Sequence, residues 1–191
     1  MDFPQRYQAE ALKAIECIDL EKVEQAIHLL AEARDHERQV FVCGNGGSFS
    51  TAAHFVTDLV KGASYGRASR FRAMALGESL STVTAYSNDV SYECLLTEEL
   101  KNFARPGDVV IAFSGSGNSP NVVEVLRYAN SIGCRTVAFT GRDGGRLGPL
   151  AEIHIHIANP HMGRIEDAHM VAMHMIVYYF MEQEPADRER A

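Results

Sequence analysis

Apolar residues recur at steps of three and four positions along residues 5–36, with acidic and basic residues between them. Side chains at this spacing share one face of a helix, so the segment is predicted to be helical and amphipathic. The pattern breaks near Asp19-Leu20-Glu21, which indicates two helices, although no glycine or proline marks the division.

Beyond residue 38 the chain changes to short apolar runs that alternate with helical stretches. The runs with the character of strands are 39–43, 72–76, 109–113, 136–140 and 153–157. The stretches with helical character are about 49–61, 79–85, 92–104, 120–131 and 164–182. Pro120 suits the first turn of its helix, because the N–H that proline lacks has no helical partner there.

Short apolar strands that alternate with helices are typical of a parallel sheet covered on both faces. No linker, repeat or low-complexity tract divides the chain. We therefore predict a single α/β domain over residues 1–191, built on a doubly wound, flavodoxin-like, five-stranded parallel sheet. In this prediction residues 38–191 form the core, and residues 1–37 form a helical arm that needs a partner.

A chain of 191 residues is long enough to bury a full core, and its formal net charge is −7. This charge argues against a protein that coats nucleic acid or anionic lipid, although it allows a local basic pocket. No apolar run approaches the roughly 20 residues that span a bilayer, and residues 1–5 lack the character of a signal peptide. The four cysteines form no CxxC pair, which is typical of a reducing compartment. We expect a cytoplasmic protein without nucleic-acid or membrane partners.

Two loops rich in glycine and serine follow the first and third predicted strands. They are Cys43-Gly-Asn-Gly-Gly-Ser48 and Ser114-Gly-Ser-Gly-Asn-Ser119. Ligands of doubly wound sheets bind at the carboxyl ends of the strands, where such loops lie. Glycine lets the backbone approach an anion, free N–H groups at a helix start attract it, and serine hydroxyls donate to it. The two loops together predict a site for a phosphate monoester, whereas no Walker A motif or GxGxxG match supports a nucleotide.

Four side chains are candidates for acid–base chemistry or for metal binding. His54 and Asp58 are four residues apart on a predicted helix and share one face, whereas Glu166 and His174, eight residues or about 12 Å apart, share a face only loosely. Carboxylate and imidazole pairs can exchange protons near neutral pH, and such a cluster can alternatively hold Zn²⁺, which polarises a carbonyl. Hydrogen-bonded core histidines and solvated helix carboxylates are the plainer interpretations of the same residues.

The order of the motifs and their residue sequences resemble those of the SIS (sugar isomerase) domain family. The resemblance is carried by the two loops, by Thr140-Gly141-Arg142-Asp143-Gly144-Gly145, and by Arg164-Ile165 with His169. The last segment is similar to the phosphoheptose isomerase branch, which resembles this chain over nearly its whole length. This resemblance implies a homotetramer with active sites at subunit interfaces. It also implies isomerisation of D-sedoheptulose 7-phosphate to D-glycero-D-manno-heptose 7-phosphate, for ADP- or GDP-heptose and thus lipopolysaccharide or other surface glycans.

The resemblance also assigns roles to individual residues. The residues expected to bind the sugar phosphate are Asn45, Gly46, Gly47, Ser48, Asp89, Ser114, Gly115, Ser116, Ser119 and Glu166. Those expected to hold Zn²⁺ are His54, Asp58, Glu166 and His174. The expected catalytic residues are Asp58, Glu166 and His174.

The chain departs from the branch at three of these positions. The branch typically has Glu at the position of Asp58 and Gln at the position of Glu166, and it often has Thr at the position of Gly115. Asp58 is one methylene shorter, which can move a general base by about 1 Å. The two carboxylate changes can compensate, with Glu166 reaching where the usual Glu lies, and two carboxylates favour a divalent metal.

A second class of function is a SIS protein that is catalytically silent. Such a protein binds a sugar phosphate, or it binds the bacterial replication initiator protein as one neighbouring branch does. That branch resembles this chain in fold and loops but tends to lack the last histidine, so His174 favours the enzyme. A sugar-phosphate sensor is a third class, which the acidic charge and the lack of a DNA-binding motif disfavour.

Overall fold

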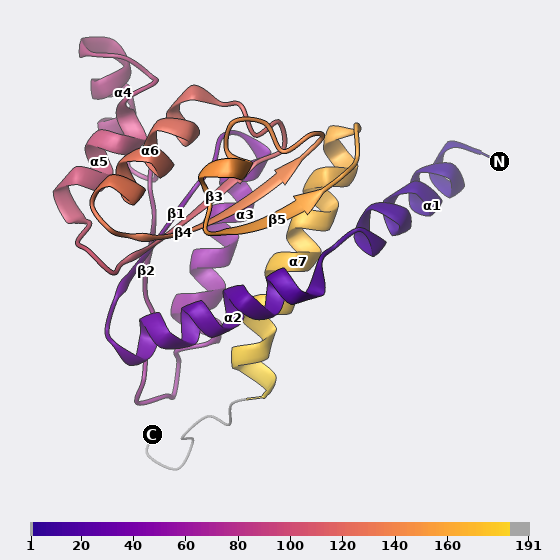
Figure 1. Ribbon diagram of the computed structural model, residues 1–191, viewed down its shortest axis with the longest axis horizontal. Coiled ribbons are helices and arrows are strands. Elements are labelled where there is room, and N and C mark those ends of the chain that lie inside the picture. The colour runs from indigo at the N-terminus through magenta and orange to yellow at the C-terminus, as the bar shows by residue number, and fades with distance from the viewer. Residues whose placement is uncertain (1, 184–191) are drawn as a thin grey trace.

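The computed structural model describes residues 2–183, in which five parallel strands form one sheet with helices on both faces (Figure 1). The strands are β1 (Gln39–Cys43), β2 (Arg72–Ala75), β3 (Val109–Ser114), β4 (Arg135–Gly141) and β5 (Ile153–Ile157). Their spatial order is β2-β1-β3-β4-β5, and every neighbouring pair is parallel. This order is that of flavodoxin-like sheets, so the predicted fold class is confirmed. Residues 184–191 of the predicted domain lie outside the described residues.

The helices agree with the sequence pattern, including the division of the N-terminal segment. They are α1 (Phe3–Glu16), α2 (Leu20–Asp35), α3 (Gly47–Thr57), α4 (Leu80–Asp89), α5 (Leu95–Phe103), α6 (Pro120–Ser131) and α7 (Met162–Glu182). Asp19 caps α2, because its carboxylate accepts a hydrogen bond of 3.2 Å from the backbone N–H of Lys22. None of the helices in residues 2–183 has the length and apolar character needed to cross a membrane.

Two hydrophobic clusters hold the helices on opposite faces of the sheet. Val40 and Val42 of β1 face the cluster that includes α2, α3 and α7, and Phe41 and Cys43 face the one that includes α5 and α6. Successive side chains of a strand point to opposite faces, so β1 can be apolar throughout and still bury every residue. The burial of both faces leaves the sheet itself open to a ligand at the ends of its strands.

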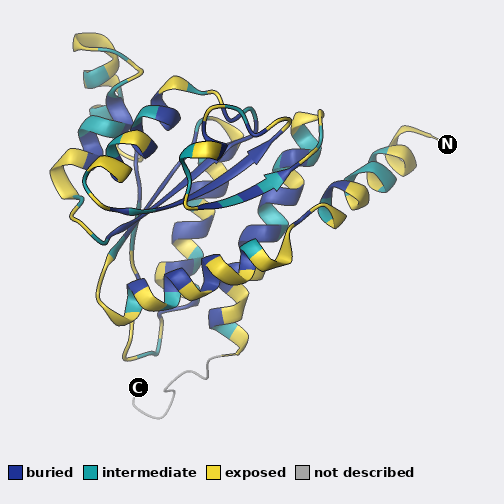
Figure 2. Ribbon diagram, in the orientation of Figure 1, coloured by how far each residue is buried: buried dark blue, intermediate teal, exposed yellow. Residues whose placement is uncertain are grey.

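Two helices contribute little to this core. No residue of α4 is buried, and Ala14 is the buried residue of α1 (Figure 2). Large apolar side chains on or next to these helices are well exposed, with Phe3 at 66%, Leu12 at 55% and Leu80 at 75%. Both helices stand away from the body of the sheet (Figure 1).

A buried histidine ties α7 to the sheet. His169 is 1% exposed, and its Nε2 lies 3.0 Å from the backbone carbonyl oxygen of Thr140 in β4. The carbonyl accepts, so Nε2 carries the proton. Burial lowers the pKa of His169 to about 4, which keeps the ring neutral at physiological pH.

We expect this histidine to make the protein sensitive to acid. As the pH falls from about 6.5 towards 4, His169 becomes protonated in the unfolded chain but stays neutral in the folded chain. The free energy of unfolding should therefore lose about 3 kcal/mol over this range, a contribution fully present above pH 6.5. Urea denaturation at a series of pH values should give a flatter dependence for His169→Gln than for the wild type. The exposed control His28→Gln should keep the wild-type slope, and the same slope in His169→Gln would contradict the assignment.

Candidate functional site

The strand order changes direction at the carboxyl ends of β1 and β3. The chain leaves β1 to form β2 on one side and later forms β3 on the other side of β1. The connections from β1 and β3 therefore diverge, and doubly wound proteins bind ligands in the crevice at such a point, so we expect the site there. The two glycine- and serine-rich loops are the segments that follow these two strands.

The first loop presents backbone rather than side chains. Gly46 has φ 55° and ψ −122°, a conformation that residues with a Cβ rarely adopt. Gly46 and Gly47 are exposed at the start of α3, whereas Ser48 is 7% exposed. Asn45 is half-buried, with its carboxamide hydrogen-bonded inside the protein. The exposed glycine backbone at a helix start suits an anion.

The second loop contains the three serines predicted to bind phosphate. Ser114 is 4% exposed, and its hydroxyl accepts a hydrogen bond of 3.2 Å from the N–H of Gly117. Ser116 accepts likewise from the N–H of Asn118, also at 3.2 Å. Ser119 occupies the N-cap position of α6, but its hydroxyl makes no hydrogen bond to the backbone N–H groups of the first turn of that helix. The Ser119 hydroxyl thus remains available at a helix N-terminus for an anionic group.

A third loop, after β4, supports the second. The N–H of Leu147 donates to the carbonyl of Gly117 at 2.9 Å, and the N–H of Arg146 donates to Asn118 Oδ1 at 3.1 Å. The backbones touch, because a methyl group on Gly117 would lie 2.2 Å from the carbonyl oxygen of Gly144. Residues 141–147 therefore support the conformation of residues 114–119. The sequence motif marked this loop, but its supporting role depends on contacts that spacing does not reveal.

Gly115 lies in close contact with a residue of α7. A methyl group on Gly115 would lie 2.4 Å from Met162 Sδ and 3.6 Å from Ile165 Cγ2. A larger residue at position 115 would require Met162 to move. The Met162 thioether thus packs over the loop where the branch often has the side chain of Thr.

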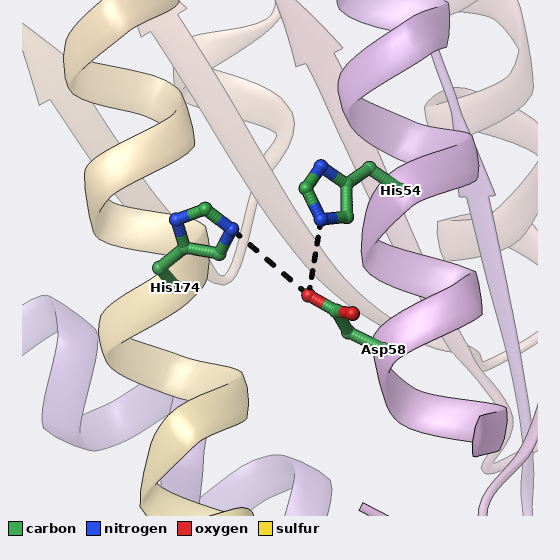
Figure 3. A group of neighbouring side chains, drawn as sticks. All are labelled: His54, Asp58 and His174. Atoms are coloured by element: carbon green, nitrogen blue, oxygen red, sulfur yellow. Dashed lines mark ion pairs between the residues drawn. The ribbon is translucent and has the colours of Figure 1, made fainter. Parts of the chain in front are cut away.

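Three of the four predicted metal ligands lie together in one group (Figure 3). His54 Nε2 lies 3.3 Å from Asp58 Oδ2, and His174 Nε2 lies 3.9 Å from the same oxygen. The side chains of His54, Asp58 and His174 are 44%, 20% and 39% exposed, so a small molecule can reach them. Asp58 begins a π-helical turn, Asp58–Gly62, which extends α3 and is of a kind often found at functional sites.

The donor set suits a divalent metal. The candidate ligand atoms of these three residues all lie within 4.8 Å of one another. Two imidazole nitrogens and one carboxylate oxygen are the ligands of a catalytic zinc site, in which three protein ligands leave a position open. The structure therefore provides a possible His/Asp metal site between α3 and α7.

Glu166 lies elsewhere. Within the described residues the group comprises His54, Asp58 and His174, and Glu166 is not part of it. Its carboxylate lies beside Gly47, where a methyl group would be 2.6 Å from Glu166 Oε1. This position is next to the first turn of α3, whose dipole favours a negative charge. Glu166 therefore does not reach the cluster within one chain, so the expected compensation for Asp58 is not seen there.

Asp89 is also separate from the loops. It is exposed at the C-terminal end of α4, and its carboxylate accepts a hydrogen bond of 2.7 Å from Asn88. Because α4 stands away from the sheet, the structure of one chain does not by itself show Asp89 at the crevice (Figure 1). Its contact with a sugar stays a prediction.

Comparisons with known proteins agree with the motifs. The SIS domain family model matches residues 5–141. A probable phosphoheptose isomerase from Thermoplasma volcanium is 41% identical over 164 residues, which cover 86% of this chain and 83% of that protein. A phosphoheptose isomerase from Helicobacter pylori (strain P12) is 33% identical over 168 residues, covering 87% and 86%. The structure of phosphoheptose isomerase GmhA from Neisseria gonorrhoeae is similar with a TM-score of 0.85 and 28% identity, covering 92% of this chain and 95% of that one.

The support that residues 141–147 give to residues 114–119 can be tested with a pair of glycine substitutions. Gly145→Ala adds a methyl group at φ +54°, 2.6 Å from the backbone of Gly117, whereas Gly66→Ala adds one at φ +72° with nothing within 4 Å. Both variants carry the cost of a positive φ, about 1–2 kcal/mol, but only Gly145→Ala also displaces the second loop. At about 2–4 °C per kcal/mol, calorimetry should show a drop in melting temperature for Gly145→Ala at least twice that of Gly66→Ala. Equal drops would show that the contact is not a support.

Proposed function

The chain belongs to the SIS domain family, within its phosphoheptose isomerase branch, and we propose that this isomerase converts D-sedoheptulose 7-phosphate to D-glycero-D-manno-heptose 7-phosphate. The observation that carries the proposal is the coexistence of two phosphate-type loops with the His54, Asp58 and His174 group. We place the reaction in the cytoplasm, in the synthesis of ADP- or GDP-heptose for surface glycans.

The loops hold the phosphate in this proposal. Ser119 offers a hydroxyl at the N-terminus of α6, and the exposed backbone of Gly46 and Gly47 lies at the N-terminus of α3. The dipole of α6 and several neutral donors can bind a dianion without a lysine or arginine, whereas the dipole of α3 already faces the Glu166 carboxylate beside Gly47. Ser114 and Ser116 contribute through the loop conformation that their hydroxyls stabilise.

In this proposal a carboxylate moves the protons, and the imidazoles serve as metal ligands. A base removes a proton from C1 of the ketose while the C2 oxygen gains one, which gives an enediol. The O1 hydroxyl of the enediol then loses its proton as C2 receives one, which gives the aldose with no net gain or loss of protons. Asp58 and His174 are 3.9 Å apart at Oδ2 and Nε2, so one sugar can contact both. Glu166, beside the first loop, is the second candidate base.

His54, Asp58 and His174 would hold Zn²⁺ in this proposal. The bound metal would supply Lewis-acid polarisation of the carbonyl oxygen. Glu166 would join the ligands only if its side chain turned away from α3, since it lies beside Gly47.

The exposed apolar helices support the proposed assembly. His54 lies seven residues beyond Gly47, about 10 Å along α3, so the cluster is distant from the loops of its own chain. We propose a homotetramer in which residues 1–37 serve as the oligomerisation arm of the 38–191 core, with sites at subunit interfaces. Phe3, Leu12 and Leu80 would be buried in that assembly.

Purified protein should interconvert the two heptose 7-phosphates, and activity should depend on the metal. We expect turnover to vanish after chelation and to return with Zn²⁺, and elemental analysis should find about one zinc per chain in the wild type and less in His54→Ala. Binding of sedoheptulose 7-phosphate without turnover under any condition would instead place the protein in the silent class.

Variants of the cluster should separate the roles of its members. Asp58→Asn should lower kcat by about 10²–10⁴, the usual contribution of a general acid or base. His174→Ala should also lower kcat, because it removes a ligand of the metal that polarises the carbonyl. Glu166→Gln restores the amide typical of the branch, and we expect it to lower kcat if Glu166 is the base. His28→Ala, on the exposed side of α2, serves as the control. Wild-type kcat in all three site variants would overturn the catalytic assignment.

The assembly should depend on the apolar side of α1. Leu12→Asp places a charge at a position 55% exposed in one chain, so folding of the chain should be unaffected while association weakens. Light scattering should give four chain masses for the wild type and for Asn102→Asp, which adds the same charge at an exposed position of α5, outside the arm. Leu12→Asp should give a smaller species with an unchanged circular dichroism spectrum. A tetramer in Leu12→Asp would remove α1 from the interface.

A further inference from the structure

Three segments meet in one hydrogen-bond network at the carboxyl edge of the sheet. Asn45 comes from the first loop, Asn121 from the first turn of α6, and Tyr92 from the connection between α4 and α5. The two amides bond reciprocally, with Asn45 Nδ2 donating to Asn121 Oδ1 at 2.8 Å and Asn121 Nδ2 donating to Asn45 Oδ1 at 2.9 Å. The Tyr92 hydroxyl donates to Asn45 Oδ1 at 2.9 Å.

The orientation of this amide pair is set by the backbone. The N–H of Val122 lies 3.0 Å from Asn121 Oδ1 and can only donate, so that atom must be the oxygen. Asn121 Nδ2 then faces Asn45 Oδ1, and the second amide is fixed in turn. Asn121 is 1% exposed, so water does not compete for these bonds.

The network uses all the acceptor capacity of both amides. Asn45 Oδ1 accepts from Tyr92 and Asn121, and Asn121 Oδ1 accepts from Asn45 and Val122. An amide oxygen has two lone pairs, so neither oxygen can accept further. Asn45 keeps one amide hydrogen, which is the only hydrogen-bonding capacity that its side chain can offer a ligand.

We propose that Tyr92 and Asn121 are positioning residues, which hold Asn45 so that its one free N–H donates to an oxygen of the bound sugar phosphate. The inference rests on the proposed function, because it takes the crevice between the two loops as the substrate site. The first loop needs such a support, since Gly44, Gly46 and Gly47 surround Asn45 and give the backbone unusual freedom. Tyr92 also links this loop to the segment of Asp89, three residues earlier, although α4 buries no residue in the core.

The test is Tyr92→Phe, which removes one hydroxyl from a side chain that is 51% exposed and leaves no cavity. Tyr65→Phe is the matched control, because Tyr65 is 74% exposed and its hydroxyl has no hydrogen-bond partner in residues 2–183. For sedoheptulose 7-phosphate we expect KM to rise about fivefold in Tyr92→Phe with kcat nearly unchanged, as for the loss of one hydrogen bond that is used equally in ground and transition states. Tyr65→Phe should match the wild type.

A second variant distinguishes positioning from a general loss of structure. In an Asn45→Ala background, Tyr92→Phe should have no further effect on KM, because its partner is already absent. A KM in Tyr92→Phe equal to that of the wild type would overturn the proposal. An equal rise in KM with or without Asn45 would do the same, since Tyr92 would then act by another route.

Binding separates this inference from the proposed function. If the wild type does not turn over sedoheptulose 7-phosphate, that substrate assignment fails, and the rise in melting temperature with the same compound or with inorganic phosphate becomes the readout. The network then predicts a smaller rise in Tyr92→Phe than in Tyr65→Phe, and equal rises would overturn it. If neither compound raises the melting temperature of the wild type, both the proposed function and this inference are wrong.

Discussion

The reversal of strand order between β1 and β3 is the constraint from which the rest of the site follows. It brings two loops from distant parts of the chain to one crevice, and both loops feed helix N-termini. Glycine is needed there because backbones pass at contact distance, as between Gly117 and Gly144. Once the loops are fixed, their free backbone groups and the Ser119 hydroxyl can face an anion.

The two halves of the chemistry are separated along the parallel helices α3 and α7. Gly47 and Glu166 lie side by side near the start of α3, and His54 and His174 follow them by seven and eight residues, about two helical turns. The shorter side chain of Asp58 still lies within 4 Å of both imidazoles, and a π-helical turn of a kind often found at functional sites begins at this residue. The departure from the usual Glu therefore leaves the His/Asp group intact, and the charge of Glu166 belongs to the loop end of the site.

Local sequence patterns predicted the fold because each strand and helix has the residue pattern that its burial in the structure requires. Val40 to Cys43 are apolar throughout, as a strand buried on both faces must be, and Asp19 caps the second helix at the expected break. The neighbours of Glu166 could not be predicted, since helical spacing gives the direction of a side chain but not which helix it meets. Asn121 was missed for a similar reason, because its partner Asn45 is 76 residues away in sequence.

The central claim is that the loops and the His/Asp group act on one sugar phosphate by proton transfer. Proton NMR of sedoheptulose 7-phosphate incubated with the metal-loaded protein in D₂O tests it directly. We expect deuterium at C2 of the aldose product and, through the reverse reaction, at C1 of the ketose, with both lost in His174→Ala. A ketose phosphate that binds but keeps both protons at C1 would contradict this mechanism, because no enediol would then form.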